Sequence, residues 1–237
     1  MLPVADRVIM ISGANRGIGL AVAHSLHDKG YRLSLGARDP AALEAATAGV
    51  PAERVLRHRY EAGDRAVAAA WVEATAGRFG AVDGLVNAAG ILLPAGIEDD
   101  ADERYEALWT INVMGPLRLT RLALPYLRAS GRGRIVNLAS LSGKRVAGDN
   151  AGYAMSKFAV VALSHATRRA GWADGVRVTA LCPGYVATDM VADVRDPPTE
   201  AMIQPADLAE LVVTVLALPN TAAIAELLVN CRLEDTV

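Results

Sequence analysis

Short runs rich in aliphatic and β-branched residues alternate along the chain with longer, alanine-rich segments whose apolar residues recur at helical spacing. This alternation is typical of successive strand, helix, strand units, which build a parallel sheet with helices on its faces. We therefore predict the α/β fold class, with a doubly wound sheet. The predicted strands are Arg7–Ser12, Arg32–Ala37, Val55–Arg59, Gly84–Asn87, Arg134–Leu138, Arg177–Cys182 and Glu226–Asn230. The predicted helices are Gly17–Lys29, Pro40–Ala48, Asp64–Phe79, Asp102–Ala129, Gly152–Trp172 and Ala206–Leu218.

The composition favours a single domain. The chain has 237 residues, of which 52% are hydrophobic, and this is enough to bury a sizeable core. No internal repeat, low-complexity segment or long Pro/Gly/Ser-rich linker divides the sequence. We predict one domain over residues 1–237.

Charge and apolar patterning exclude several classes of partner. The formal net charge is −2 and the charges are interspersed, so the chain has no basic stripe for a nucleic acid. No apolar run approaches the ~20 residues of a membrane span, and no signal-like segment opens the chain. We expect a cytoplasmic protein without a membrane partner. Cys182 and Cys231 are predicted to be ordinary core thiols, and the four histidines, including His24 and His27, are not expected to bind metal.

A glycine-rich loop joins the first predicted strand to the first predicted helix. Its spacing is Gly-x-x-x-Gly-x-Gly, and glycines let a backbone approach a ligand closely. Free N–H groups at the start of a helix, together with the helix dipole, favour a pyrophosphate at this position. The candidate cofactor-binding residues of the loop are Gly13, Asn15, Arg16, Gly17, Ile18 and Gly19.

Tyr153 and Lys157 are four residues apart, in a segment predicted to be helical, and Ser140 lies thirteen residues before the tyrosine. Residues at i and i+4 share one face of a helix, so both side chains would point into one cleft. A tyrosine has an ordinary pKa of about 10, and a nearby ammonium group would stabilise its phenolate. Ser140 would donate a hydrogen bond to a reacting oxygen. This set predicts a proton-transfer site for the interconversion of a carbonyl compound and an alcohol.

With these motifs in this order, the chain resembles the short-chain dehydrogenase/reductase family, of the compact type without an added substrate domain. The resemblance runs from Val8 to about Val229. It implies a single Rossmann-like domain, with a seven-stranded parallel sheet and three helices on each face. It also implies an oxidoreductase that moves a hydride between a nicotinamide cofactor and a carbonyl or secondary alcohol. Small molecules are the expected substrates.

The resemblance assigns four catalytic residues. Tyr153 exchanges the proton, and Lys157 lowers the pKa of that tyrosine and binds the nicotinamide ribose. Ser140 orients the carbonyl; Ser142 is a competing serine, but Ser140 has the family spacing. Asn112 matches the asparagine that interrupts the long helix of relatives and holds a water that connects Lys157 to solvent.

The end of the second predicted strand indicates NADP(H). An acidic residue there binds the ribose hydroxyls of NAD and repels a 2′-phosphate. This chain has Ala37 at that position, followed by Arg38, and Arg16 matches a second basic position of NADP-preferring relatives. Asp39, next to Arg38, would weaken the preference. The other cofactor-binding residues implied by the resemblance are Glu61, Asn87, Ala88, Ala89, Gly90, Tyr153, Lys157, Pro183, Gly184, Val186 and Thr188.

The candidate substrate pocket is mostly apolar. Its residues, by position in relatives, are Ile91, Leu92, Leu93, Leu141, Ser142, Val146, Asn150, Tyr185, Met190 and Val194. They favour an uncharged, moderately hydrophobic ketone or aldehyde, although Lys144 and Arg145 lie close in sequence. Residues 189–204 are predicted to form a lid over the substrate.

Two other functions remain open at this stage. Related nucleotide-sugar epimerases and dehydratases also use Tyr-x-x-x-Lys, but generally carry an additional C-terminal substrate region, for which the residues up to Val237 leave little room. A non-catalytic NADP(H)-binding regulator is the second alternative, but it could lose Tyr153 or Ser140. Relatives usually pair through their two long helices, and Ala151, Gly152 and Ala154 would allow close approach. We expect a homodimer or homotetramer.

Overall fold

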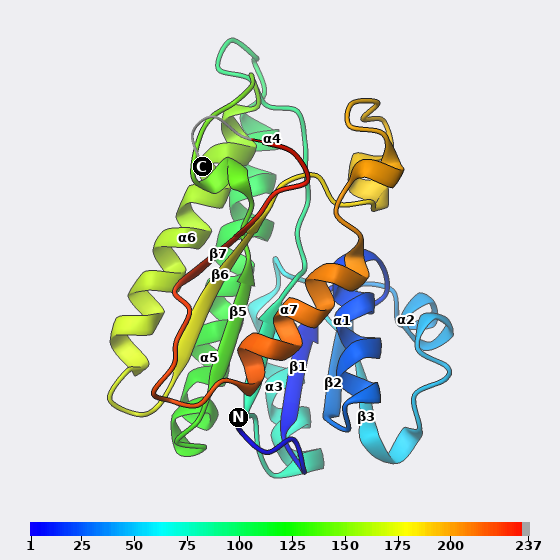
Figure 1. Ribbon diagram of the computed structural model, residues 1–237, viewed down its shortest axis with the longest axis vertical. Helices are drawn as coiled ribbons and strands as arrows, with labels where there is room; N and C mark the ends of the chain where they lie inside the picture. The colour runs from blue at the N-terminus through cyan, green and yellow to red at the C-terminus, as the bar shows by residue number, and fades with distance from the viewer. Residues whose placement is uncertain (234–237) are drawn as a thin grey trace.

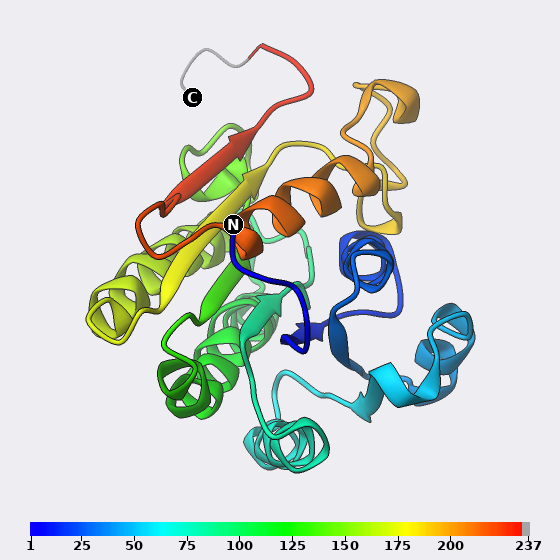
Figure 2. The same ribbon diagram turned by 60° about the horizontal axis from the view of Figure 1, so that its bottom comes forward.

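The computed structural model describes residues 1–233, and this part of the chain forms a seven-stranded sheet between two layers of helices (Figures 1 and 2). All neighbouring strands are parallel, in the order β3-β2-β1-β4-β5-β6-β7. The predicted fold class is confirmed. The strands are β1 (Val8–Ser12), β2 (Arg32–Ala37), β3 (Val55–Arg59), β4 (Gly84–Asn87), β5 (Arg134–Leu138), β6 (Arg177–Pro183) and β7 (Glu226–Val229).

The helices are divided between the two faces of the sheet (Figure 2). One face carries α1 (Gly17–Asp28), α2 (Pro40–Ala46) and α7 (Pro205–Ala217). The other carries α3 (Arg65–Phe79), the continuous pair α4 (Asp102–Leu108) and α5 (Gly115–Ala129), and α6 (Ala151–Gly171). Among the described residues, no helix is both long enough and apolar enough to cross a membrane.

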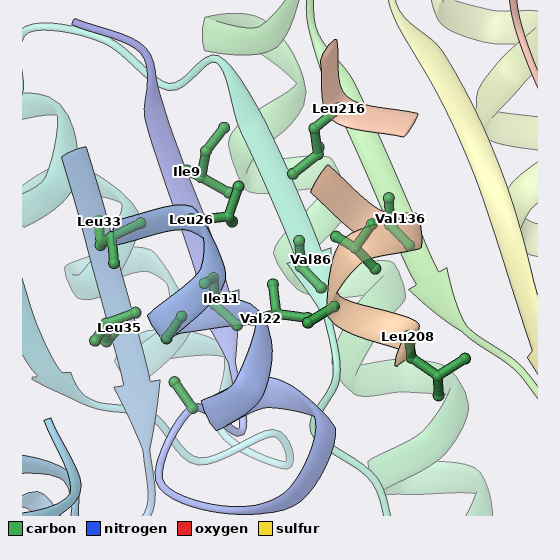
Figure 3. Close-up of a cluster of buried hydrophobic side chains, with 14 of the residues drawn as sticks. Ile9, Ile11, Val22, Leu26, Leu33, Leu35, Val86, Val136, Leu208 and Leu216 are labelled. Carbon is green, nitrogen blue, oxygen red and sulfur yellow. The ribbon is translucent and has the colours of Figure 1, made fainter. Parts of the chain in front are cut away.

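Side chains of the central strand β1 point alternately into two separate hydrophobic cores, one on each face of the sheet. Ile9 and Ile11 pack toward α1 and α7, where Val22 of α1 and Leu208 of α7 close the layer (Figure 3). Met10 points the other way, into the cluster around Trp71 of α3 and Leu85 of β4. Side chains alternate across a strand, so a strand buried on both faces must be apolar throughout, as β1 is.

The long helix predicted over Asp102–Ala129 is interrupted. A π-helical turn, Trp109–Met114, separates α4 from α5. Pro116 has no amide hydrogen and cannot donate to the carbonyl of residue 112, which breaks the α-helical pattern at this point. The Gly115 amide instead donates to the carbonyl of Thr110, five residues back. The turn buries the Asn112 side chain.

Residues 189–204, which were predicted to form a lid, contain two short 3-10 helices, Asp189–Val191 and Thr199–Ala201. One smaller prediction needs adjustment. Cys182 is fully buried, as predicted for a core thiol, but Cys231 is only half-buried.

We predict opposite stability effects for two Gly→Ala substitutions. A Cβ at Gly36 of β2 would lie 2.6 Å from the Trp71 ring, so Gly36→Ala should destabilise the protein by about 1–3 kcal/mol. Gly77, in the last turn of α3, has open space at its Cβ position, and Gly77→Ala should stabilise by about 0.4–1 kcal/mol. Urea unfolding of both variants measures the difference. Equal effects would show that the packing of Trp71 on β2 is not as described.

Candidate active site

The glycine-rich loop between β1 and α1 needs glycine for steric reasons. Gly13 has a φ of 71°, and a Cβ there would lie 2.9 Å from the backbone nitrogen of Ala89. A Cβ at Gly19 would collide with the carbonyl oxygen of Gly13. The loop therefore turns tightly beside the end of β4, and its backbone stays accessible to a ligand.

The N-terminus of α1 opens into a groove. Within residues 1–233, no side chain caps this helix end and its first turn carries no acidic residue. Its first N–H groups and the positive end of the helix dipole can therefore receive an anion. The groove has a volume of about 430 Å³. Its wall brings together these predicted cofactor residues: Gly13, Asn15, Arg16, Gly17, Ile18, Gly19, Arg38, Glu61, Ala88, Ala89, Gly90 and Thr188.

Two arginines lie on the wall of this groove, each beside a carboxylate. Arg16 Nη1 is 3.4 Å from Asp189 Oδ2, and both side chains are largely exposed. The Asp39 carboxylate, adjacent to Arg38, accepts hydrogen bonds from the amides of Ala41 and Ala42 and so caps α2. The positive N-terminus of α2 thus partly neutralises the Asp39 carboxylate, so this carboxylate repels a phosphate at Arg38 less strongly.

Ser140, Tyr153 and Lys157 lie on the wall of a second cavity, of about 380 Å³. The Lys157 Nζ donates a hydrogen bond of 2.8 Å to the Leu138 carbonyl, and lies 5.5 Å from the centroid of the Tyr153 ring. The Ser140 hydroxyl accepts a hydrogen bond from the Ser142 amide. The two spaces adjoin, because they share five wall residues: Ile18, Ala88, Gly90, Thr188 and Met190.

Burial shifts the two titratable groups of this cavity in opposite directions. It raises the pKa of Tyr153 to about 12, and a hydrogen bond with Ser140 only partly opposes this effect. It lowers the pKa of Lys157 to about 8. At neutral pH the tyrosine is therefore a neutral proton donor and the lysine is an ammonium group. Desolvation dominates the shift in the pKa of Tyr153, and a lowering of that pKa by Lys157 stays a prediction.

Asn150 fixes the helix that carries the tyrosine. Its side-chain oxygen accepts a hydrogen bond from the Tyr153 amide, and its side-chain nitrogen donates to the Leu93 carbonyl. Asn150 was predicted as a pocket residue, and it lines the cavity. Its hydrogen bonds add a positioning role, since an N-cap sets where the first turn of α6 begins.

Asn112, predicted as catalytic, lies on neither cavity wall. Its side-chain oxygen accepts from the Ile91 amide at 2.8 Å, and its nitrogen donates to the Ile91 carbonyl at 2.9 Å and to the Ser156 hydroxyl at 3.1 Å. These three hydrogen bonds clamp the loop after β4 against α6. A Cβ at Gly90 would lie 3.3 Å from the Asn112 oxygen and 3.9 Å from Lys157 Nζ, so the clamp is next to the lysine.

A buried polar chain joins β4, β5 and α6. Asn87 donates to the Asn137 side-chain oxygen at 2.7 Å, and Asn137 donates to the Ser164 hydroxyl at 2.9 Å. Asn87 was predicted to bind the cofactor, but its side chain is buried in the sheet and does not line the groove. Sequence reasoning missed Asn137 and Ser164; the only available signal was an asparagine within an apolar strand.

Most of the predicted substrate residues lie on the second cavity. Its wall includes Leu92, Leu141, Ser142, Val146, Asn150, Tyr185 and Met190, together with Pro183, Gly184, Val186 and Thr188. Ile91 lines the groove instead, and Leu93 and Val194 line neither space. Sequence reasoning did not place Arg145, Asp149 and Arg232 on this wall, because loop geometry and the end of β7 bring them there.

The combined site can hold an anionic dinucleotide in the groove and a small molecule against a neutral proton donor in the adjoining cavity. In the part of the chain that the structure describes, no group of three or more His, Cys, Asp or Glu side chains could hold a metal ion.

Comparison with known proteins identifies close relatives. The family model for short chain dehydrogenases matches residues 7–199. An agropine synthesis reductase from Rhizobium rhizogenes is 44% identical over 229 residues, which are 96% of this chain and 53% of the relative. The chain thus spans about half the length of that relative.

Solved structures agree over nearly the whole chain. A short-chain dehydrogenase/reductase, glucose/ribitol dehydrogenase, from Brucella melitensis superimposes with a TM-score of 0.88 at 28% identity, covering 97% of this chain and 98% of that one. An alcohol dehydrogenase from the archaeon Thermococcus sibiricus, complexed with 5-hydroxy-NADP, gives a TM-score of 0.86 at 30% identity, covering 94% and 95%.

Proposed function

The chain belongs to the short-chain dehydrogenase family, whose members are oxidoreductases that use nicotinamide cofactors, and on that premise we propose a more specific activity for it. It transfers a hydride between NADP(H) and a carbonyl or secondary alcohol substrate, and it acts mainly as a reductase. The observation that carries this proposal is the placement of Ser140, Tyr153 and Lys157 on one cavity wall beside the groove at the N-terminus of α1. The reductase among the relatives supports the direction.

The groove fits a dinucleotide cofactor. Gly13 and Gly19 let the loop turn tightly against the end of β4, where a Cβ would collide with backbone atoms, and the uncapped start of α1 suits a pyrophosphate. Arg16 and Arg38 are the residues that would hold a 2′-phosphate, because guanidinium groups make charge-assisted, bidentate bonds to phosphate. When bound, the nicotinamide supplies the hydride. Thr188, Val186 and Gly184 would line its site.

Side chains of the protein transfer the proton to the substrate oxygen. Ser140 donates a hydrogen bond to the carbonyl oxygen and stabilises the negative charge that develops on it. Tyr153, which is protonated at neutral pH and whose pKa is raised by burial to about 12, gives its proton to the same oxygen. Lys157, held by the Leu138 carbonyl, stabilises the phenolate that Tyr153 becomes. Asn112 and Asn150 position the loop and helix on which these groups depend.

Residues 189–204 are proposed to form the substrate lid. Met190 and Val191 line the substrate cavity, and Asp189 reaches Arg16 across the groove. Movement of this segment would therefore open both spaces together. The single-domain assignment over residues 1–237 remains part of this proposal, as does the cytoplasmic location.

One assay separates this function from its two alternatives. NADPH oxidation with members of a panel of aldehydes and ketones supports the reductase. Sugar-nucleotide isomerisation without net cofactor turnover would support an epimerase. Tight NADP(H) binding without turnover of any substrate would support a regulator, although such a protein has no need of the pair formed by Tyr153 and Lys157.

We predict that Arg38→Ala removes most of the preference for NADPH. The wild type should favour NADPH over NADH in kcat/KM, and the variant should lower this ratio by about tenfold to a hundredfold, the loss expected for one charge-assisted hydrogen bond. Arg59→Ala is the control, because Arg59 ends the neighbouring strand β3 and does not line the groove. A wild type that prefers NADH would contradict the cofactor assignment.

Tyr153→Phe should lower turnover by at least ~10², because it removes the proton donor and leaves the cavity shape intact. Affinity for NADPH, measured by fluorescence titration, should be retained. Tyr185→Phe removes a hydroxyl from the wall of the same cavity and should have a much smaller effect. Near-normal turnover in the Tyr153 variant would exclude the proposed mechanism.

The reductase should lose activity as pH rises through about 8, the pKa of Lys157. Below that pH the lysine is an ammonium group that stabilises the developing phenolate, and above it the charge is lost while Tyr153 is still protonated. Measurement of kcat/KM for reduction from pH 6 to pH 10 tests this. Circular dichroism at each pH distinguishes loss of charge from unfolding, and a flat profile would count against the role of Lys157.

We propose a homodimer or homotetramer, with pairing through α4, α5 and α6. Exposed apolar side chains on these elements support it, with Trp109 47%, Met155 54% and Phe158 42% exposed. Gly152 and Ala154, the small residues expected at such an interface, are instead buried within the chain, Gly152 against Ala95 and Leu108. Phe158→Lys should weaken the assembly in light scattering at micromolar concentration. A wild type that is only monomeric would contradict this proposal.

A further inference from the structure

One carboxylate links the turn after Ser140 to two other elements. Lys144 ends the 3-10 turn Leu141–Gly143, and its Nζ lies 2.6 Å from Glu226 Oε2. The other oxygen of Glu226, Oε1, accepts a hydrogen bond of 2.6 Å from His165 Nε2. An ionised carboxylate can only accept, so this imidazole nitrogen carries the proton. Glu226 of β7 thus joins the turn to α6, and we call Lys144, His165 and Glu226 the edge network.

Glu226 points to the α6 face of the sheet because of its place in β7. The next residue, Leu227, packs against the core on the opposite face, with α1 and α7. Successive side chains of a strand project to opposite faces, so Glu226 projects toward α6. The side chains of Glu226, Lys144 and His165 are 22%, 27% and 43% exposed. Solvent therefore screens these charges less than it screens a pair on the open surface.

The two ends of the turn are anchored in different ways. Its first residue, Leu141, is buried on the cavity wall. Its last residue, Gly143, lies so close to α6 that a Cβ there would be 2.6 Å from the Lys157 carbonyl oxygen. Lys144 follows directly and brings the charge that Glu226 binds. Apolar burial thus fixes the start of the turn, and ionic contacts fix its end against the helix that carries the catalytic lysine.

The Glu226 carboxylate is ionised at neutral pH. Hydrogen bonds from Lys144, and next from His165, hold the pKa of Glu226 below its usual range. None of these three side chains lines the cavity or the groove. The edge network therefore acts on the site through the backbone of the turn and not by contact with a substrate.

We propose that Glu226 is a positioning residue for Ser140. Its carboxylate fixes the turn through Lys144 and fixes α6 through His165. The same helix carries Tyr153. The serine and tyrosine hydroxyls must reach one substrate oxygen, and a misplacement of about 1 Å can lower a rate by ~10². This proposal rests on the proposed function, because it concerns the group that stabilises the carbonyl oxygen in that reaction.

Hydrogen exchange measures this anchoring without a substrate. The amides of Gly143 and Lys144 donate to the carbonyls of Ser140 and Leu141, each at 2.9 Å. Glu226→Gln removes the negative charge from both contacts of the edge network, so these amides should exchange faster by about fivefold or more. Mass spectrometry of peptides that span residues 139–145 reports the change. Exchange in the central strand β1 should stay the same.

A double-mutant cycle tests whether the effect passes through the serine. With the aldehyde or ketone that the wild type reduces fastest, Glu226→Gln should lower kcat by about tenfold and leave the KM for NADPH unchanged. Ser140 stabilises charge that develops only in the transition state, so its displacement affects kcat. In a Ser140→Ala background, the same Glu226→Gln substitution should change kcat by less than about twofold, because the group that it positions is already absent.

Lys144→Met and Lys29→Met are a matched pair. Lys29, at the end of α1, has its Nζ 3.9 Å from Glu210 Oε2 of α7, and it lines neither the cavity nor the groove. Both substitutions remove an ammonium group from an ion pair between two elements. Lys144→Met should reproduce the exchange and kinetic effects of Glu226→Gln, whereas Lys29→Met should have neither effect. Lys144→Arg, which can keep the ion pair, should retain most of the wild-type kcat.

Unchanged exchange at residues 139–145 in Glu226→Gln and Lys144→Met would overturn the proposal. A wild-type kcat in both variants, or an equal loss of kcat with and without Ser140, would overturn it as well. Failure of the proposed function is recognised separately, by a wild type that oxidises NADPH with no carbonyl compound. The exchange measurement then decides by itself: faster exchange confined to this turn supports the role of Glu226, and unchanged exchange overturns it.

Discussion

Both cavities depend on the pairing of β1 with β4. The strand order reverses at this pair, because β2 and β3 follow on one side of β1 and β4 to β7 follow on the other. The loops that leave these two strands must pass each other at the carboxyl edge of the sheet. The Ser12 hydroxyl joins them by accepting hydrogen bonds from the amides of Ala88 at 3.1 Å and Ala89 at 3.2 Å. Gly13 permits the same close approach. In open parallel sheets this switch point is where ligands bind, because loops diverge to either side of it.

A second constraint is that Lys157 is buried and Tyr153 is half-buried beside it. The Lys157 ammonium group donates a hydrogen bond to the Leu138 carbonyl at the end of β5, which compensates part of its desolvation. The buried chain from Asn87 through Asn137 to Ser164 fixes the same strand against α6. Burial then keeps Tyr153 protonated and brings the pKa of Lys157 near to physiological pH. The packing of α6 against the sheet therefore also sets the pKa values of Tyr153 and Lys157.

Positive charge gathers at this edge from four separate parts of the chain. Arg16 and Arg38 lie on the groove, and Arg145 and Arg232 lie on the adjoining cavity. Asp189 pairs with Arg16 and Asp196 with Arg232, and both carboxylates belong to residues 189–204, the proposed lid; Asp39, next to Arg38, caps α2. On the proposed function, the phosphate of the cofactor would be bound in the groove, and the ion pair between Arg16 and Asp189 of the proposed lid would be exchanged as the cofactor enters.

The sequence by itself determined the sheet, the glycine loop and the spacing of Ser140, Tyr153 and Lys157, because apolar period, glycine positions and helical spacing are local properties. It also placed most residues of both cavities through its resemblance to a family. Only the tertiary structure decided that Asn112 and Asn87 brace the fold, that desolvation raises the tyrosine pKa, and that Arg145 and Arg232 share a wall. These outcomes depend on which loops meet and how deeply a group is buried, and residues far apart in sequence set both of those quantities.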